Sequence, residues 1–177
     1  MGDSKTHGGS DGGAATPSAV RAGAQRRKSW RDRIMHGAFL LMRPMTLGVR
    51  GVAFDADGRV LLVKHGYIQG WHFPGGGVER GETCEQALMR EMAEEACLQV
   101  EPPLKLHGLF QNINMSPRDH VAVYVTRSFR VTGARQPDRE ILAAQFFAPD
   151  ALPDDATRAT RARLSEILHA RPLSPTW

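Results

Sequence analysis

The sequence has 177 residues, 41% of them hydrophobic and 24% charged, which is the composition of a single globular domain. Its two cysteines, Cys84 and Cys97, are too few for a disulfide framework and have no partners at zinc-binding spacing. No segment approaches the roughly 20 apolar residues of a membrane helix, so we expect a soluble, cytoplasmic protein that does not bind membranes.

The net charge of +4 belongs to the N-terminal part of the chain. Residues 1–45 hold 8 Lys or Arg against 3 Asp, which leaves 15 basic and 16 acidic residues for the remainder. Residues 1–28 contain almost no large apolar side chain, and we predict a disordered basic arm there. Trp30, Ile34 and Phe39 predict a short docking helix and linker over residues 29–45, although a partner-binding helix has the same pattern.

The main domain is expected over residues 46–172 and begins with two β-type segments. Residues 46–55 and 59–65 are separated by Ala56, Asp57 and Gly58, a composition that favours a tight hairpin turn. The unbroken apolar sequence from Val60 to Val63 predicts a strand that is covered on both faces.

Further strands are predicted over residues 104–111, 120–131 and 144–147. In the second of these, Arg127 interrupts the apolar side, so burial must end before the strand does. Residues 157–169 carry Leu164, Ile167 and Leu168 at helical spacing. A sheet with helices packed on its faces follows from this order of elements.

The most informative helix should begin at about Thr83, because Thr83 and Gln86 have the spacing of a capping box. At about 100° per residue, its side chains divide into an apolar face and an acidic face that adjoin. The apolar face contains Leu88, Met92 and Ala96, and the acidic face contains Glu91, Glu94 and Glu95.

Three like charges at neighbouring helical positions are destabilising, so such a cluster raises its own pKa values or binds a cation. Oxygen ligands select a hard cation, which makes Mg²⁺ the first choice and Mn²⁺ the second. A solvated face, with Arg90 paired to Glu94, is the alternative and is more common for a glutamate triplet alone. The preceding loop reverses this balance, because Gly75, Gly76 and Gly77 lack Cβ atoms and let the backbone approach phosphate or metal.

Residues 71–98 resemble the Nudix box and the approach to it. The matching residues are Trp71, Pro74, Gly75, Gly76, Glu82, Arg90, Glu91, Met92, Glu94, Glu95 and Leu98, with Cys97 where the family has glycine. The resemblance implies an α/β fold, an α/β/α sandwich with a central mixed β-sheet. It also implies a Mg²⁺-dependent hydrolase of phosphorus-containing acid anhydrides, in which metal-activated water cleaves the phosphoanhydride bond of a nucleoside diphosphate linked to another moiety.

The resemblance also assigns roles to residues. Glu91, Glu94 and Glu95, with the carbonyl of Gly75, would hold the metal, and Glu82 and Arg90 would orient the cluster. One carboxylate would act as the base, and we expect the loss of Glu94 to harm catalysis most.

Candidates for substrate binding are weaker. They are Gly76, Gly77, Trp71 and Glu140, although core packing explains Trp71 and a surface ion pair explains Glu140 about as well. His72, His120 and Phe73 could also face substrate, but core packing or a local hydrogen bond is at least as common for such residues. Cys97 stands where the helix should end in a left-handed residue, at a cost of roughly 1 kcal/mol for a residue other than glycine.

The expected substrate is a small nucleotide. One alternative is an RNA 5′-end pyrophosphohydrolase, for which the basic arm would supply phosphate contacts, but nucleic acid is the less favoured partner. Another is a non-catalytic nucleotide-sensing module, which the complete glutamate triplet argues against. The sequence is compatible with a homodimer.

Overall fold

The computed structural model describes residues 45–177. The predicted arm over residues 1–28 and the predicted docking helix and linker, apart from Met45, lie outside the described residues. No helix in residues 45–177 is long and apolar enough to cross a membrane. The elements in chain order are β1 (Thr46–Ala53), β2 (Val60–His65), β3 (Trp71–His72), α2 (Cys84–Ala96), β4 (Leu98–Val100), β5 (Lys105–Gln111), β6 (Asp119–Thr126), β7 (Phe129–Val131), β8 (Ile141–Phe147) and α3 (Arg158–His169).

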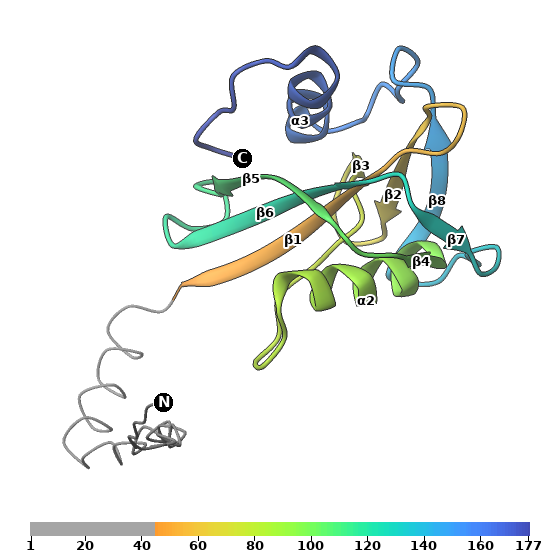
Figure 1. Ribbon diagram of the computed structural model, residues 1–177, viewed down its shortest axis with the longest axis horizontal. Coiled ribbons are helices and arrows are strands. Elements are labelled where there is room, and N and C mark those ends of the chain that lie inside the picture. Colours follow the sequence, from red (N-terminus) through yellow and green to blue (C-terminus); the bar gives the residue numbers. More distant parts are fainter. Residues whose placement is uncertain (1–44) are drawn as a thin grey trace, which may run out of the picture. The chain divides into compact units, whose positions relative to one another are not determined.

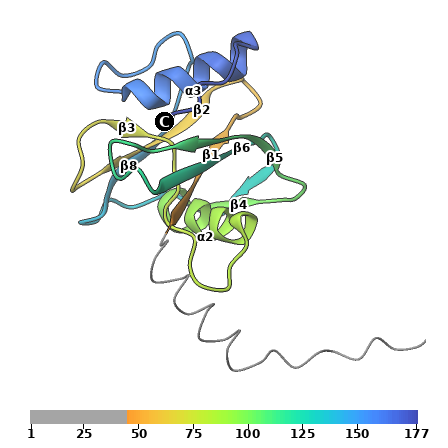
Figure 2. The same cartoon turned by 90° about the vertical axis from the view of Figure 1, so that its left-hand side faces the viewer.

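The strands lie between α2 and α3. β1, β6 and β5 are neighbours in that order, with β1 parallel to β6 and β5 antiparallel to it. β3, β2 and β8 form an antiparallel group, and β4 pairs with β7. Two perpendicular views place α2 on one side of the strands and α3 on the other (Figures 1 and 2), which confirms the predicted α/β/α sandwich with mixed strands.

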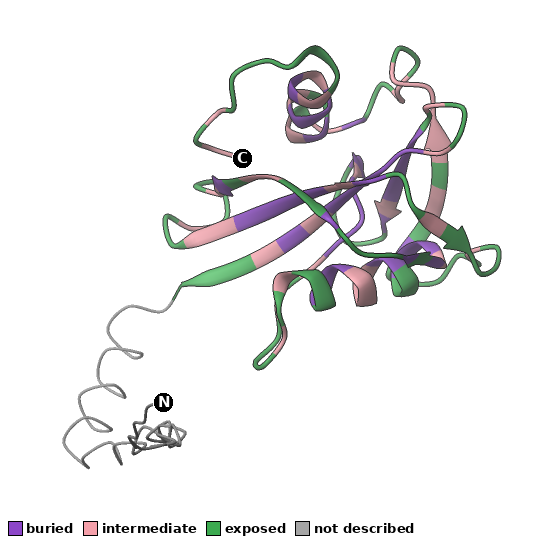
Figure 3. Ribbon diagram, in the orientation of Figure 1, coloured by how far each residue is buried: buried purple, intermediate pink, exposed green. Residues whose placement is uncertain are grey.

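Alternate residues of the central strands build one core against each helix, and the buried segments therefore run through the middle of the domain (Figure 3). The four residues from Val60 to Val63 are at most 2% exposed, as their unbroken apolar sequence predicted. The core against α2 includes Val49, Leu61, Leu88 and Met92, and the core against α3 includes Val52, Val60, Leu62 and Leu164.

The predicted hairpin between residues 46–55 and 59–65 is wrong in its strand pairing, although its turn is present. Hydrogen bonds from Asp55 N to Arg59 O and from Gly58 N to Asp55 O, both 3.0 Å, close the turn. Beyond a single bridge between Phe54 and Val60, β1 pairs with β6, and β2 pairs with β3 and β8. The turn residues specify a chain reversal, but the strand partners are set by packing with segments distant in the sequence.

The predicted strand over residues 120–131 is two strands with different partners. β6 ends at Thr126, whose hydroxyl accepts a hydrogen bond from Ser128 N at 3.1 Å. Arg127 is exposed beside this break, with its guanidinium 4.5 Å from the centre of the Phe54 ring. β7 then pairs with β4, a three-residue strand that the sequence did not predict. The last strand, β8, begins at Ile141 rather than at residue 144.

The two predicted helices that fall within residues 45–177, α2 and α3, begin at their capping residues. The Thr83 hydroxyl accepts a hydrogen bond from Gln86 N at 3.2 Å, and the Gln86 side chain accepts one from Thr83 N at 2.9 Å, which confirms the capping box. Thr157 caps α3 in the same way, by accepting from Thr160 N at 3.2 Å. At the other end of α2, Cys97 has a φ of 52°, the left-handed conformation expected there.

The last five residues also pack on the domain, beyond the predicted boundary at residue 172. Gln111 N donates to Pro175 O at 3.0 Å, and Trp177 N donates to Gln111 O at 2.9 Å. The Trp177 ring lies 6.2 Å from that of Phe110 between ring centroids. This segment therefore extends the edge of the sheet next to β5.

Candidate active site

Helix α2 holds the three predicted carboxylates at different depths. The exposed fraction of the side chain is 8% for Glu95, 13% for Glu91 and 61% for Glu94. The order follows from helical geometry, because Leu88 and Met92 turn one side of α2 into the core and Glu95 lies beside them. The helix thus carries one buried, one half-buried and one exposed acid toward the same loop.

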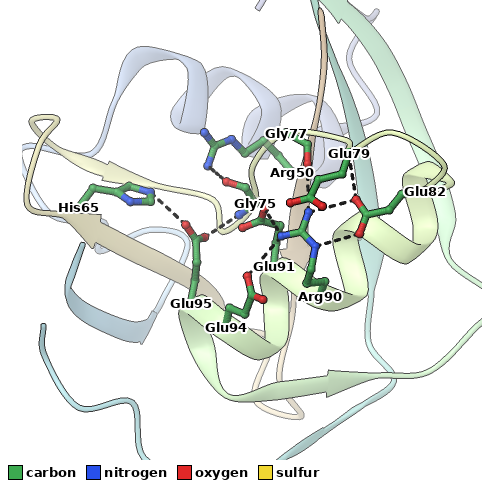
Figure 4. A network of polar contacts seen from close by, with 10 residues as sticks. All are labelled: Arg50, His65, Gly75, Gly77, Glu79, Glu82, Arg90, Glu91, Glu94 and Glu95. Carbon is green, nitrogen blue, oxygen red and sulfur yellow. Dashed lines mark hydrogen bonds and ion pairs between the residues drawn. The ribbon is translucent and has the colours of Figure 1, made fainter. Parts of the chain in front are cut away.

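Arg90 connects the carboxylates to each other and to the loop (Figure 4). Its Nε and Nη2 atoms donate to the two oxygens of Glu82 at 2.9 and 3.1 Å, and Nη1 donates to Glu91 at 2.8 Å and to Glu94 at 3.3 Å. Nη2 also donates to Gly77 O at 3.2 Å. Hydrogen bonding to Glu82 and Glu91 raises the pKa of Arg90, and the same contact lowers the pKa of Glu82.

The glycine loop, Gly75 to Gly77, passes so close to β1 and α2 that side chains on Gly75 and Gly76 would not fit. Gly75 has a φ of 140°, and a Cβ there would meet Val49 O at 2.1 Å. Its N–H donates to Glu95 Oε2 at 2.7 Å. A Cβ on Gly76 would lie 2.3 Å from an oxygen of Glu91, whereas Gly77 has open space around it. The loop backbone therefore lies directly over the acidic face of α2.

Arg50, on β1, is a site residue that the sequence analysis missed. Its Nη1 donates to Phe73 O at 3.0 Å and to Gly75 O at 2.5 Å, so these hydrogen bonds fix the start of the glycine loop to β1. The carbonyl predicted as a metal ligand, that of Gly75, therefore accepts a hydrogen bond from a guanidinium. Burial lowers the pKa of Arg50, and the nearby charges of Glu95 and Glu91 oppose that shift. A charged residue in the middle of an otherwise apolar and glycine-containing strand is the signal that could have identified it.

His65, at the end of β2, was also missed. Its Nε2 lies 3.6 Å from Glu95 Oε1, and neither ring nitrogen has a hydrogen-bond partner among the described residues. Burial lowers the pKa of His65 to about 4, so the ring is neutral at pH 7. Burial also raises the pKa of Glu95 to about 7; the Gly75 N–H and Arg50 oppose this rise, and Glu91 and Glu140 add to it.

The remaining candidates are placed less uniformly. Trp71 is 9% exposed and packs edge-on against Phe147 at 4.8 Å between ring centroids, so its ring belongs to the core, as does that of Phe73. Glu140 is exposed and close enough to Glu95 to raise its pKa. His72 makes no hydrogen bond to a carboxylate of the site within residues 45–177. Its Nε2 instead contacts Gln69 O at 2.9 Å. His120 lies on β6, with its Nδ1 buried and without a partner in the described chain.

The donor set suits a hard divalent cation in its chemistry. Four carboxylates, those of Glu82, Glu91, Glu94 and Glu95, face the guanidinium groups of Arg50 and Arg90, which leaves an excess of negative charge. Within residues 45–177, however, no three acidic, histidine or cysteine side chains already converge as a ligand set. Glu91 and Glu94 bind Arg90 and Glu95 binds the Gly75 N–H, so ligation would require these carboxylates to change partners.

A cavity of about 420 Å³ adjoins this cluster. Arg50 forms part of the cavity wall and also donates a hydrogen bond to the glycine loop, so it connects the cavity to the cluster. The other walls come from the segments around β3, the loop after β5, the start of α3 and the last residue, and include His72, Asn112, Asn114, Arg158 and Trp177. Its volume is within the range of about 300–1,000 Å³ that is usual for small-molecule sites.

Comparison with known proteins matches residues 44–167 to the NUDIX domain. The chain is 32% identical to an ADP-ribose pyrophosphatase of Methanocaldococcus jannaschii over 102 residues, which cover 56% of this chain and 60% of that protein. It is 48% identical to an RNA pyrophosphohydrolase of Aeromonas hydrophila over 50 residues, which cover 28% of this chain and 29% of that protein. The chain thus spans less than two thirds of either relative.

Among solved structures, a MutT NUDIX hydrolase from Burkholderia pseudomallei superimposes with a TM-score of 0.57 and 28% sequence identity. The alignment covers 69% of this chain and 97% of that one. The domain match extends over most of the chain and includes both the glycine loop and α2. The chain belongs to the Nudix hydrolase family, whose members act on pyrophosphate bonds.

Proposed function

We propose that this protein is a Mg²⁺-dependent hydrolase that cleaves the phosphoanhydride bond of a small nucleoside diphosphate derivative. The observation that carries the proposal is the excess of carboxylates on α2 directly beneath the backbone of the glycine loop, where a Cβ on Gly76 would meet Glu91. Mg²⁺ bound there, held by Glu91, Glu94 and Glu95, would neutralise the diphosphate and make water more acidic. Mn²⁺ has the same ligand preference and is the expected substitute.

The protein's own residues would position the reacting groups. Arg90 fixes Glu82, Glu91 and Glu94 relative to one another, and the Gly75 N–H fixes Glu95. One of Glu91, Glu94 and Glu95 would take the proton from the attacking water. Charge-assisted bonds of this kind hold side chains in the narrow range of positions that catalysis requires.

Arg50 is suited to hold the diphosphate. Only its Nη1 has hydrogen-bond partners among the described residues, which leaves its Nη2 and Nε donors available. The same residue lines the cavity of about 420 Å³, where the rest of the substrate would fit. A guanidinium held by two carbonyls is rigid, and its remaining donors match phosphate oxygens in geometry.

A panel of nucleoside diphosphate derivatives, assayed with Mg²⁺ and with Mn²⁺, tests the proposal. We expect turnover of at least one compound, no turnover in EDTA, and a loss of at least about 10–100-fold in Glu94→Gln. Arg50→Lys keeps the charge but cannot bind both carbonyls, so we expect a higher KM with a smaller change in kcat. Turnover of Glu94→Gln at the wild-type rate under saturating Mg²⁺ would exclude the assigned role of Glu94.

RNA with a 5′-terminal pyrophosphate is the second candidate substrate, because an RNA pyrophosphohydrolase shares 48% identity over 50 residues. Deleting residues 1–28 distinguishes the two. An RNA substrate predicts a strong, salt-sensitive loss of activity on deletion of the basic arm, and a small nucleotide predicts almost none. No activity on either class would instead support nucleotide sensing without catalysis.

A further inference from the structure

A second cavity, of about 730 Å³, lies at the other end of α3 from the cavity beside the glycine loop. The first cavity includes Thr157 to Ala159, at the start of α3, and the second includes Glu166, Ile167, Ala170 and Arg171, at and just after its end. Glu166 follows Ala159 by seven positions, which corresponds to about 10 Å along the helix axis. No residue of the glycine loop or of α2 lines the second cavity, so it is separate from the candidate active site.

The second cavity is positively charged. Lys105 at the start of β5, Arg127 after β6 and Arg171 after α3 all line it. In the part of the chain that the structure describes, none of these three cations forms an ion pair with a carboxylate. Three unpaired cations around one concave site focus a positive potential there, which raises the local concentration of anions.

The one carboxylate in the wall does not neutralise these cations. Glu166 is 7% exposed and accepts hydrogen bonds from Arg163 Nη2 at 2.7 Å and from Ser174 N at 3.0 Å. Its second oxygen lies 3.3 Å from His107 Nε2. Arg163 is itself buried and stacks on the Phe110 ring at 4.0 Å. The negative charge of Glu166 is therefore balanced by the buried Arg163, and Glu166 is not free to pair with the three cations of the cavity.

The wall also has apolar surface, from Pro103, Val125, Ile167 and Ala170. A volume of about 730 Å³ is within the range of about 300–1,000 Å³ typical of small-molecule sites. A concave site with both cations and apolar surface suits a compact molecule with one anionic and one apolar part. Nucleic acid would be expected to follow a longer basic stripe along the surface.

We infer that this cavity binds a phosphate-bearing small molecule of nucleotide size, whose phosphate contacts Lys105, Arg127 and Arg171. The apolar wall then covers the ring system of the ligand. This inference does not depend on the proposed hydrolase activity, because the cavity shares no residue with the carboxylate cluster.

Calorimetric titration of the full chain with AMP in EDTA tests the inference. We expect one AMP per chain and a Kd about tenfold weaker in Lys105→Gln and in Arg171→Gln, since each variant removes one charged contact. Both side chains are exposed, so neither substitution disturbs the core. Arg130→Gln is the matched control: Arg130 is also exposed but lies on β7 outside the cavity, and its loss should leave the Kd unchanged.

Adenosine and inorganic phosphate identify which part of AMP is recognised, and each should bind more weakly than AMP. The inference would be overturned by no binding of AMP at millimolar concentration, or by binding that neither cavity variant weakens, which would place AMP elsewhere on the chain. Binding of a short 5′-monophosphorylated RNA far more tightly than AMP, with the same loss in both variants, would show a nucleic-acid surface instead.

Discussion

Gly76 and Gly77 are neighbours in the sequence, but a methyl group added at Gly76 would clash with another side chain and one added at Gly77 would not. A Cβ on Gly76 would lie 2.3 and 2.9 Å from the two oxygens of Glu91, whereas a Cβ on Gly77 would have nothing within 4 Å. Neither glycine has a positive φ, so the backbone itself tolerates alanine. We predict that Gly76→Ala displaces the Glu91 carboxylate and lowers kcat/KM by about 100-fold, while Gly77→Ala leaves Glu91 in place and lowers kcat/KM much less.

The measurement is kcat/KM on the best substrate of the panel, together with the midpoint of thermal unfolding for each variant. The atoms that must move are at the flexible end of a side chain, so the stability of Gly76→Ala should change by less than about 1 kcal/mol. A Gly76→Ala protein that is as active as Gly77→Ala would show that the position of Glu91 is not critical.

Single residues of the site could be predicted where a short motif defined them. The spacing of Glu91, Glu94 and Glu95 on one helix determines their common face, whatever the rest of the chain does. Arg50 and His65 could not be found in this way, because each reaches the cluster from a different strand. Arg50 and His65 reach the cluster because the fold packs both β1 and β2 next to the glycine loop, and this packing is a property of the tertiary structure.

At the scale of the helix, the two C-terminal caps offer a matched pair. Cys97 and Ala170 both adopt the left-handed conformation, with φ of 52° and 48°. A residue with a Cβ is strained there by roughly 1 kcal/mol, which glycine avoids. We therefore predict that Cys97→Gly and Ala170→Gly are each neutral or stabilising, by up to about 1 kcal/mol, in urea unfolding.

The comparison between the two positions gives the experiment its control. A clear decrease in stability for Cys97→Gly, with none for Ala170→Gly, would show that the Cys97 thiol contributes packing that outweighs the relief of strain. Equal behaviour of both variants would assign the effect to backbone conformation alone.

Elements with local signals were predicted correctly, and strand partners were not. The hydroxyls of Thr83 and Thr157 mark the starts of α2 and α3 through contacts within three residues. By contrast, β1 pairs with β6, and these strands are more than 60 residues apart in the chain. The strand β4 has only three residues, which is too few for an alternating pattern to indicate it. It forms by pairing with β7, which is distant in the sequence.

For the molecule as a whole, we expect Glu95 to link stability to pH and, as a proposed ligand, to Mg²⁺. Burial raises its pKa from 4.5 to about 7. A carboxyl with a raised pKa in the folded state contributes stability that is fully present below the unfolded pKa and is lost as pH rises through the folded pKa. The window therefore runs from about pH 4.5 to just above pH 7, and the full effect is about 3 kcal/mol for a shift of this size.

His65 acts in the opposite direction, and the experiment must separate the two groups. Burial lowers the pKa of His65 from 6.5 to about 4, so its contribution to stability increases with pH through that range. Glu95→Gln removes only the carboxyl titration. In EDTA, the free energy of unfolding of wild type minus that of Glu95→Gln should decrease between about pH 5 and pH 8.

Mg²⁺ should reverse this loss, because a cation stabilises the ionised form of a ligand carboxyl and competes with its proton. We predict that the increase in melting temperature caused by Mg²⁺ is small at about pH 5 and grows as pH rises through 7 in the wild type. The same titration in Glu95→Gln should show a weaker and flatter response. A Mg²⁺ effect that is independent of pH, or equal in the two proteins, would mean that Glu95 does not take part in binding the cation.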